Sequence, residues 1–353
     1  MKALLNSRTQ PAPADGVERD TLRAGGIPRS LFVAAAVLVL LLAGAGVTIA
    51  NGLSEAAHIS NTLVGHYASV TSIDWSADGK YLASASLDNR VRIWDVATGR
   101  ITNSFKLQGL ASGVSWSPDG KQVAAVGRNA QVLTLASGRM ALPLQYAAAP
   151  NNDVEWSPDG ARIAGASEQT IFIWNGQTLH PLPELVLVGH KQEVNGVAWS
   201  RDSTRLASAS DEGAVRLWNA SGTGGNEVLV HPEEAGGIKS VAWSPDMKRL
   251  VSGAAGGQVY IWDVESKRIV QTFAAHDDQV TGVDWSPDGR RIATGSSDQS
   301  LKIWDASNGT LILSLRGNVW DQAPVSAVQW SLDGTQVATA SGSRIRIWNV
   351  GGK

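Results

Sequence analysis

The sequence predicts an all-β protein: a seven-bladed β-propeller of four-stranded blades, preceded by one transmembrane helix. Three observations support this prediction. A tryptophan recurs at intervals of 40 to 45 residues, each interval holds sequence for four short strands, and one uncharged apolar segment lies near the N-terminus. Among the 353 residues there are 14 Trp but only 4 Phe and 4 Tyr, so one large aromatic residue fills the same position repeatedly.

The first tryptophan of each unit ends a predicted inner strand. A β-branched aliphatic residue stands two positions before it, so both side chains point to the same face of the strand. In most units a turn follows, as in Ser117-Pro118-Asp119-Gly120, whose proline and glycine suit a reversal into a hairpin. The seven tryptophans, separated by 41, 40, 43, 44, 42 and 45 residues, are Trp75, Trp116, Trp156, Trp199, Trp243, Trp285 and Trp330.

A second tryptophan follows the first at a nearly constant interval in six units. These residues are Trp94, Trp174, Trp218, Trp262, Trp304 and Trp348. In the second unit we expect Leu135 to take the equivalent place. A small-residue strand such as Tyr81 to Ser86 and a strand such as Val91 to Trp94 lie between the paired tryptophans, and a short strand such as Ile101 to Phe105 follows. Four strands in a period of about 42 residues make a propeller blade.

The last unit has no sequence for a fourth strand, because it ends at Val350, just after Trp348. Residues Ile59 to Val64 stand where a fourth strand precedes each of the other units. We therefore expect this N-terminal segment to complete the seventh blade, which would remove an exposed sheet edge. The predicted propeller spans residues 59–353.

These motifs resemble those of the WD40-repeat β-propeller family over about Ile59 to Val350. The dipeptide that ends the family's repeat occurs at Trp94-Asp95, Trp262-Asp263 and Trp304-Asp305. The opening Gly-His dipeptide occurs at Gly65-His66 and Gly189-His190, with Ala275-His276 as a variant. Each of these three histidines precedes the second tryptophan of its unit by the same interval.

The resemblance implies a buried hydrogen-bonded group in each regular unit. Its members are the opening histidine, a serine or threonine of the second strand, an aspartate of the next turn and the tryptophan. The expected residues are His66, Ser84 or Ser86, Asp88 and Trp94 in the first unit, His190, Ser208 and Trp218 in the fourth, and His276, Asp298 and Trp304 in the sixth. The fourth unit has Glu212 in place of the aspartate, the fifth has Gly256 there, and the second lacks both histidine and tryptophan, so these blades should hold less tightly.

The chain is not expected to be an enzyme. A histidine beside an aspartate also suits a catalytic triad, but here the pair recurs in blades that point in different directions. The six histidines form no pair at metal-ligand spacing, and the resemblance needs no cofactor. There is no cysteine, which excludes disulfides and cysteine-held metals. From Asn51 onward 25 Lys and Arg face 29 Asp and Glu, which argues against a nucleic-acid partner.

Residues Leu31 to Ala50 carry no charge, and this length of helix spans the roughly 30 Å apolar core of a bilayer. We expect a cytoplasmic disordered tail at 1–30, a transmembrane helix at 31–50 and a linker at 51–58. Basic residues precede the segment and none follows it closely, so the N-terminus should be cytoplasmic and the propeller extracytoplasmic. The alternative is a cleaved signal peptide and a secreted propeller.

The leading functional hypothesis is a membrane-anchored scaffold for protein–protein interaction. The alternative is a periplasmic or secreted propeller with a small-molecule or catalytic site in its central channel. In the family, the connection between blades lies on the face most used for partners. Trp320, the one tryptophan that the repeat does not require, is expected either to bind a partner or to fold back over a blade edge. The candidate partner-binding residues are Trp320, Asp321, Tyr67, Lys191, Glu233, Glu234, Asp277 and Asp278.

Overall fold

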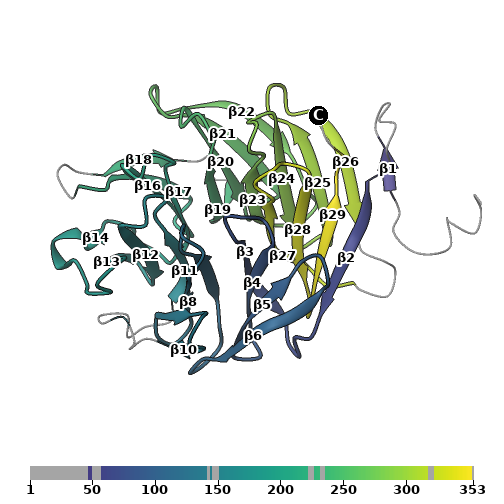
Figure 1. Ribbon diagram of the computed structural model, residues 1–353. Helices are drawn as coiled ribbons and strands as arrows, with labels where there is room; N and C mark the ends of the chain where they lie inside the picture. The colour runs from purple at the N-terminus through teal and green to yellow at the C-terminus, as the bar shows by residue number, and fades with distance from the viewer. Residues whose placement is uncertain are drawn as a thin grey trace, which may run out of the picture. The chain divides into compact units, whose positions relative to one another are not determined.

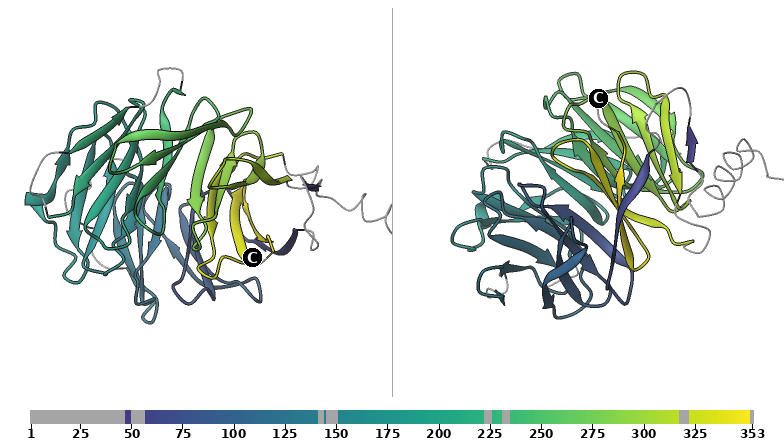
Figure 2. Two further views of the ribbon diagram at one scale, coloured as in Figure 1. Left: turned by 90° about the horizontal axis from the view of Figure 1, so that it is seen from above. Right: turned by 45° about the vertical axis from the view of Figure 1, so that its right-hand side comes forward.

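Seven antiparallel sheets make up the described part of the chain, and their innermost strands contact one another in cyclic order (Figure 1). The computed structural model describes residues 47–49, 57–140, 144, 151–221, 226–230, 235–316 and 322–351. All of them belong to the unit that runs from Gly44 to Lys353. Figure 1 shows the blades arranged around an axis, with inner strands such as β3 (Val70–Trp75) near it and outer strands such as β22 (Arg268–Ala274) away from it, and Figure 2 shows the same chain from two further sides. The predicted seven-bladed propeller is confirmed.

The first three blades take consecutive strands. Their strands are β3 (Val70–Trp75), β4 (Tyr81–Ser86), β5 (Arg90–Asp95) and β6 (Arg100–Lys106); β7 (Gly113–Trp116), β8 (Gln122–Val126), β9 (Gln131–Thr134) and β10 (Arg139–Met140); and β11 (Asn151–Trp156), β12 (Arg162–Ser167), β13 (Thr170–Asn175) and β14 (Leu187–Val188). A short 3₁₀ helix, η1 (Pro183–Leu185), precedes β14.

The remaining four blades follow the same order. Their strands are β15 (Val194–Trp199), β16 (Arg205–Ser210), β17 (Ala214–Asn219) and β18 (Glu227–Val230); β19 (Ile238–Trp243), β20 (Arg249–Ala254), β21 (Gln258–Asp263) and β22 (Arg268–Ala274); β23 (Val280–Trp285), β24 (Arg291–Ser296), β25 (Ser300–Asp305) and β26 (Leu311–Arg316); and β27 (Val325–Trp330), β28 (Gln336–Ser341) and β29 (Arg344–Asn349).

The hydrophobic core lies between neighbouring blades. Small residues dominate the second strands, and residues 82–86 of β4 are all buried. One side of blade 1 packs Ala83 and Val91 against Val114 and Trp116 of blade 2 in a single cluster. Such flat, small-residue strands let two sheets approach face to face, because their side chains take little space between the sheets. Burial between blades therefore fixes the tryptophan positions that repeat in the sequence.

The N-terminal strand β2 (His58–Val64) completes the seventh blade, as the sequence predicts. It pairs antiparallel with β29, with Leu63 opposite Ile345 and His58 opposite Asn349. Leu63 is fully buried and joins a cluster shared by blades 7 and 1. The two ends of the repeat region thus close the ring through one sheet, in which β2 covers the edge of β29.

Blade 2 corrects one sequence-based assignment. Leu82 pairs with Trp94 in blade 1, and the equivalent Val123 pairs with Leu133, so Leu133 and not Leu135 stands at the tryptophan position. Leu133 lies two residues closer in sequence to its partner Val123 than Trp94 lies to Leu82, and counting residues from Trp116 could not detect this. Leu133 is fully buried.

The end of the predicted transmembrane helix is also corrected. Residues Val47–Ile49 form a strand, β1, which pairs antiparallel with β26 and adds a fifth strand to blade 6. All three side chains are β-branched and favour a strand, and the outer edge of β26 offers unpaired backbone groups. The rest of 31–50, the tail at 1–30 and most of the linker lie outside the described residues. Within the described ranges, no helix has the length and apolar character needed to cross a membrane.

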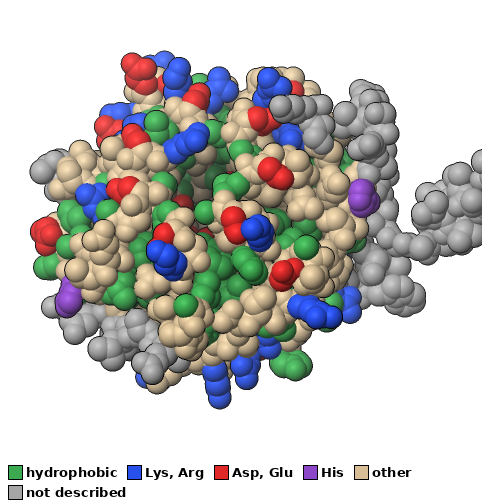
Figure 3. Space-filling model, viewed as in Figure 1, with side chains coloured by type: hydrophobic (Ala, Val, Ile, Leu, Met, Phe, Trp, Pro, Cys, Tyr) green, Lys and Arg blue, Asp and Glu red, His purple; other side chains and the backbone are tan. Residues whose placement is uncertain are grey.

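The strand order gives the ring two different faces. The turns from first to second strand and from third to fourth strand lie on one face, here called the turn face. The turns from second to third strand and the connections between blades lie on the other, here called the connection face. Figure 3 shows that charged side chains of both signs are spread over the surface in view.

Candidate functional site

A buried hydrogen-bonded group lies beneath the connection face in blade 1. Asp88 Oδ2 is 2.9 Å from His66 Nδ1, His66 Nε2 is 2.7 Å from Ser84 Oγ, and Trp94 Nε1 donates to Ser84 Oγ at 2.8 Å. Ser84, not Ser86, is therefore the serine of this group, because Ser86 Oγ donates to the carbonyl of Ala68 instead. The structure brings together all four residues that the resemblance implies.

The same group is complete in blade 4, where the carboxylate is a glutamate. Glu212 Oε1 is 2.6 Å from His190 Nδ1, His190 Nε2 is 2.7 Å from Ser208 Oγ, and Trp218 Nε1 donates to Ser208 at 2.8 Å. Glu212 also accepts a hydrogen bond from Arg216 Nε at 3.0 Å. The sequence predicts a weaker group in this blade, but the longer side chain reaches the same histidine.

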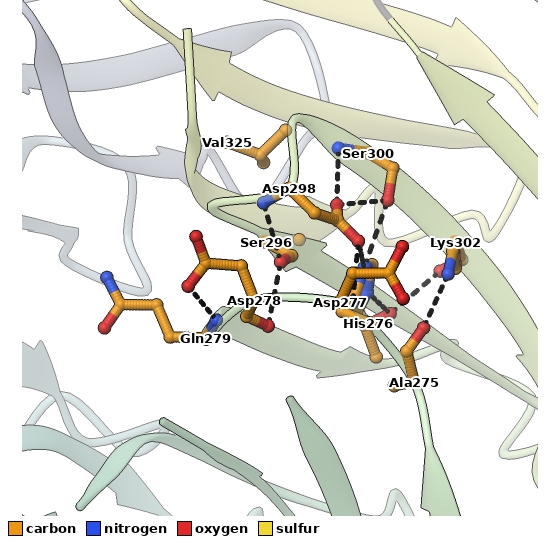
Figure 4. A network of polar contacts seen from close by, with 12 residues as sticks. Ala275, His276, Asp277, Asp278, Gln279, Ser296, Asp298, Ser300, Lys302 and Val325 are labelled. Carbon is orange, nitrogen blue, oxygen red and sulfur yellow. Dashed lines mark hydrogen bonds and ion pairs between the residues drawn. The ribbon is translucent and has the colours of Figure 1, made fainter. Parts of the chain in front are cut away.

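In blade 6 a threonine takes the hydroxyl position, for which no residue was predicted. His276 Nε2 is 2.7 Å from Thr294 Oγ1, and Trp304 Nε1 donates to the same oxygen at 2.9 Å. Figure 4 shows Asp298 between His276 and Ser300; it lies 2.9 Å from His276 Nδ1 and accepts from Ser300 Oγ at 2.5 Å. Thr294 follows His276 at the same interval that separates Ser84 from His66, so this signal was available.

The proton positions follow from the partners and the pKa shifts. Burial lowers the pKa of His66 and His190, so both rings are neutral at pH 7. Burial alone would raise the pKa of Asp88, but hydrogen bonds from Arg92 and His66 outweigh it and lower this pKa to about 2. The ionised carboxylate therefore accepts from Nδ1–H, and Nε2 accepts from the serine hydroxyl. Ser84 is fully buried, so its oxygen cannot reach a substrate as a nucleophile.

The other blades hold only part of this group. Trp262 donates to Ser252 at 3.0 Å in blade 5, and Trp348 donates to Thr339 at 2.8 Å in blade 7. In blade 3, Gly165 stands at the serine position, where a Cβ would lie 2.8 Å from the ring of Trp174. The polar group is thus complete in blades 1, 4 and 6 of the described structure.

The residue after each of the three histidines is held by the buried carboxylate. Its backbone N–H donates to Asp88 from Tyr67 at 3.1 Å, to Glu212 from Lys191 at 2.9 Å, and to Asp298 from Asp277 at 3.3 Å. All three side chains are exposed on the connection face, and Tyr67 is 87% exposed. The buried group therefore fixes the backbone of three displayed positions.

The remaining candidate partner-binding residues divide into two sets. Asp278 is exposed beside Asp277, and its carboxylate accepts from the N–H of Gln279 at 2.7 Å. Glu233, Glu234, Trp320 and Asp321 lie outside the described residues. The expected roles of Trp320, partner contact or edge cover, stay predictions.

The inner strands carry a second set of carboxyls, which sequence reasoning missed. Asp74, Glu155 and Asp284 each precede the first tryptophan of a unit, and Asp153 precedes Glu155 by two residues. Because Ile73 and Trp75 pack into the core, Asp74 between them faces the ring axis. The alternation along the strand could have revealed this position.

These axis-facing carboxyls join neighbouring blades. Asp74 accepts from the N–H of Trp116 at 2.6 Å, Glu155 from Trp199 at 2.6 Å, and Asp284 from Trp330 at 2.7 Å. Asp153 accepts from the N–H of Val197 at 3.0 Å, so it too reaches the next blade. The carboxyls thus act as links between successive inner strands.

Burial raises the pKa of all four axis-facing carboxyls, to about 6 for Asp74 and Asp153, to about 7 for Asp284, and well above the ordinary value for Glu155. The charge of Asp74 raises the pKa of the other three further.

In the part of the chain that is described, no three His, Cys, Asp or Glu residues are grouped as a metal site requires.

A small apolar pocket lies at the outer edge of blade 3. Its volume is about 170 Å³, and it is lined by Phe172, Ile173, Pro181, Leu182, Pro183 and Val186. Sites for drug-sized ligands occupy roughly 300–1,000 Å³ and combine apolar walls with a few polar groups. This pocket is smaller, and its walls are apolar. It gives no support to a small-molecule site in the central channel.

Comparison with known proteins adds a family match. The profile described as WD domain, G-beta repeat matches residues 58–95, 152–175, 182–219, 226–263, 267–305 and 309–349, more than half of the chain. The strands of blade 2 from β7 to β10 fall outside these segments.

Curated relatives match over smaller shares. The chain is 27% identical over 155 residues to cell division cycle 20.1, cofactor of APC complex, from Arabidopsis thaliana, which covers 42% of this chain and 33% of that protein. It is 27% identical over 173 residues to protein HIR1 from Cryptococcus neoformans, covering 49% and 17%. It is 29% identical over 170 residues to apoptotic protease-activating factor 1 from Rattus norvegicus, covering 45% and 13%. The chain therefore spans a third or less of the length of these relatives.

Proposed function

Because this chain belongs to the WD40-repeat family, we propose that it is a protein-interaction scaffold whose partner docks on the connection face. The observation that carries the proposal is the repeated position after the histidine. Tyr67, Lys191 and Asp277 hold this position in three blades, are exposed, and are anchored to buried carboxylates. Side chains of different chemistry on a rigid backbone suit selective recognition of another protein.

Catalysis has less support. Among the described residues, the arrangement that resembles a catalytic triad occurs in three copies with buried hydroxyls. The relatives' names describe a cofactor of a complex and a protease-activating factor, in agreement with the prediction that the chain is not an enzyme. From these relatives we transfer only the expectation of a protein partner.

A small-molecule site around the ring axis is the weaker candidate. The four axis-facing carboxyls are polar groups that interrupt the repeat, which is what such a site would need. However, each of them already accepts a backbone hydrogen bond from the following blade. Their geometry is accounted for by the links between blades.

The scaffold is further proposed to be held at a membrane by Leu31 to Ala50, with the N-terminus cytoplasmic and the propeller on the outer side. The support is the uncharged segment and the basic residues before it. Strand β1 uses residues 47–49 of this segment, and the sixteen residues before it would span only about 24 Å as a helix. Residues 47–49 therefore cannot pair with β26 and complete the transmembrane helix at the same time.

Photo-cross-linking tests the docking face. A photoreactive phenylalanine analogue is placed at Tyr67, Lys191 or Asp277 of the full-length chain in its own cells. Leu332, 58% exposed in a turn on the opposite face, is the matched control position. We expect cross-linked protein partners from the three connection-face positions and none from position 332. Cross-links confined to position 332, or none from any position, would overturn the proposed docking face.

Membrane attachment is tested by alkaline carbonate extraction, and orientation by protease added to intact cells. We expect the full-length chain to stay in the membrane pellet and the propeller to be cleaved from outside. Extraction into the supernatant would refute the anchor, and a mature chain that begins near Asn51 would favour the cleaved signal peptide.

A further inference from the structure

Three loops meet at Ser86 on the connection face of blade 1. Ser86 Oγ donates to the carbonyl of Ala68 at 3.0 Å, and the N–H of Ala111 donates to the carbonyl of Ser86 at 3.2 Å. The N–H of Leu87 donates to the carbonyl of Ser69 at 2.9 Å. These bonds hold together the connection into blade 1, the turn between β4 and β5, and the connection into blade 2.

Each of the three loops exposes one large apolar side chain beside this junction. Tyr67 precedes Ala68, Leu87 follows Ser86, and Leu110 precedes Ala111. Their exposed fractions are 87% for Tyr67, 41% for Leu87 and 56% for Leu110. We call these three residues the blade 1 patch. Large apolar side chains gathered on a rigid surface are typical of a protein-binding site, because a partner can bury them together.

Basic residues surround the blade 1 patch. Arg90 and Lys106 face each other at the ends of β5 and β6 that lead to this face. Arg128 lies against the loop that carries Leu110, since a Cβ on Gly109 would be 3.0 Å from Arg128 Cβ. None of the three basic residues forms an ion pair within the described structure.

The one acidic residue in these loops is already neutralised. Asp88 is paired with Arg92 at 2.6 Å and with His66 at 2.9 Å, and both its side chain and that of Arg92 are buried. The guanidinium of Arg92 lies 5.6 Å from the ring centre of Tyr67, but its charge is balanced by Asp88, so the unpaired positive charges near the patch are those of Arg90, Lys106 and Arg128. The surroundings of the patch are therefore positive.

On the connection face, the exposed charges of the connection into blade 6 are negative. This connection carries the exposed Asp277 and Asp278, and the Lys302 ammonium there is turned inward to the carbonyl of Ala275 at 2.7 Å, as Figure 4 shows. An acidic ligand would be repelled at blade 6 and attracted at blade 1. The difference in charge selects one sector of the face for such a ligand.

We propose that the blade 1 patch binds a short acidic peptide segment of a partner protein, with a leucine or aromatic side chain seated against Tyr67, Leu87 and Leu110. This inference rests on the proposed scaffold function and assigns its partner chemistry. Carboxylates of the segment pair with Arg90, Lys106 and Arg128. Because these basic residues are solvent-accessible, the affinity falls as salt concentration rises.

A peptide selection tests the proposal directly. The full-length chain, purified in mild detergent, is used to select from a display library of random twelve-residue peptides. We expect the selected peptides to be rich in Asp and Glu around one Leu, Phe, Tyr or Trp. Recovery of basic peptides, or of none above the background of detergent alone, would overturn the proposal.

Variants of the chain then locate the binding. Arg128→Glu and Leu110→Ser should each weaken the selected peptide about tenfold or more, as loss of a central contact does. The matched controls on the turn face are Arg201→Glu and Leu332→Ser, which replace exposed residues of the same types. All four variants should melt within about 2 °C of the parent chain, because the residues are on the surface. Equal binding by all four would place the peptide elsewhere and refute the patch.

The outcome separates this inference from the proposed function. One outcome is that photo-cross-linking still finds partners at Lys191 or Asp277 while the Arg128→Glu variant keeps its peptide affinity. That result would support the scaffold function and refute the blade 1 patch as the peptide site. If no position of the connection face cross-links, the proposed function itself fails.

Discussion

The connection face and the ring axis both hold carboxyl groups packed among the blades, but in opposite electrostatic settings. Asp88 at the connection face is met by Arg92 and His66, and its pKa is lowered to about 2. Asp284 at the axis is met only by backbone N–H groups and lies near another carboxyl, and burial raises its pKa to about 7. The first kind is an ionised anchor for exposed residues. The second kind links neighbouring blades, and burial destabilises its ionised form.

This difference separates the two functional hypotheses. A partner site needs exposed side chains on a rigidly held backbone. The ionised anchors hold the backbone in this way at Tyr67, Lys191 and Asp277. A solute site at the axis would need polar groups free to bind. The axis-facing carboxyls are occupied by the N–H groups of neighbouring strands, which favours the connection face as the site of function.

The largest expected effect comes from removing an ionised anchor. Asp88→Ala leaves Arg92 buried without its partner, so we expect a loss of about 3–5 kcal/mol in the free energy of unfolding. Denaturant titration of the purified chain measures it. The control is Glu227→Ala, which removes the half-exposed pair with Lys267 and should cost at most about 1 kcal/mol. A similar loss of unfolding free energy in both variants would show that the buried carboxylate stabilises the chain no more than an exposed one.

Removing the hydroxyl of the same group should cost less, because no charge is left unpaired. Ser84→Ala removes the partner of both His66 Nε2 and Trp94 Nε1, with an expected loss of about 2 kcal/mol. Ser104→Ala, an exposed serine of β6, should change stability by less than about 0.5 kcal/mol. The same denaturant titration decides; an unchanged midpoint for Ser84→Ala would show that the hydroxyl adds nothing to the blade.

The axis carboxyls should give the chain a stability that falls as pH rises. With a folded pKa near 7 for Asp284, the folded chain keeps a proton that the unfolded chain loses above its ordinary pKa, so stability declines between pH 4 and pH 7. Asp284→Asn keeps an acceptor for Trp330 but has no charge. We expect it to remove roughly 1–2 kcal/mol of the decline between pH 5 and pH 8.

Thermal melting of both forms at the two pH values measures this decline. The lowered pKa of His66 and His190 acts in the other direction, since those rings resist the proton that the unfolded chain accepts below pH 6.5. Comparison of the variant with the parent chain cancels this contribution. An identical pH dependence in the two forms would show that Asp284 is ionised without cost.

The repeat could be predicted from the sequence because burial between blades demands the same residue types at the same intervals. The pattern identifies Ile59 to Val64 as the closing strand for that reason, and β2 lies there. It misplaces Leu135, since the paired positions of the second and third strands lie two residues closer in sequence in blade 2, and nothing before them in the pattern signals this. It also places Val47–Ile49 in a helix, because the long uncharged segment has no signal that separates these three residues from the apolar residues before them.

The candidate site was predicted in part. The constant interval between histidine and tryptophan located His66, His190 and His276, but not the ability of Glu212 to replace an aspartate, which depends on the reach of one side chain. The axis-facing carboxyls were missed, although the alternation of Asp74 with Ile73 and Trp75 could have revealed its position. Its effect on the pKa of Asp153 and Asp284 could not be predicted, because ring closure decides which carboxyls come close together.

Affinity capture with two matched variants tests the central claim most directly. One variant of the full-length chain changes the connection face (Tyr67→Ser, Lys191→Glu and Asp277→Lys), and the other changes the axis (Asp74→Asn and Asp284→Asn). Partners recovered from membranes of the native host are identified by mass spectrometry, with thermal melting on the same preparations. We predict that the face variant loses the parent chain's partners at an unchanged melt and that the axis variant keeps them. Loss in the axis variant alone would contradict this prediction.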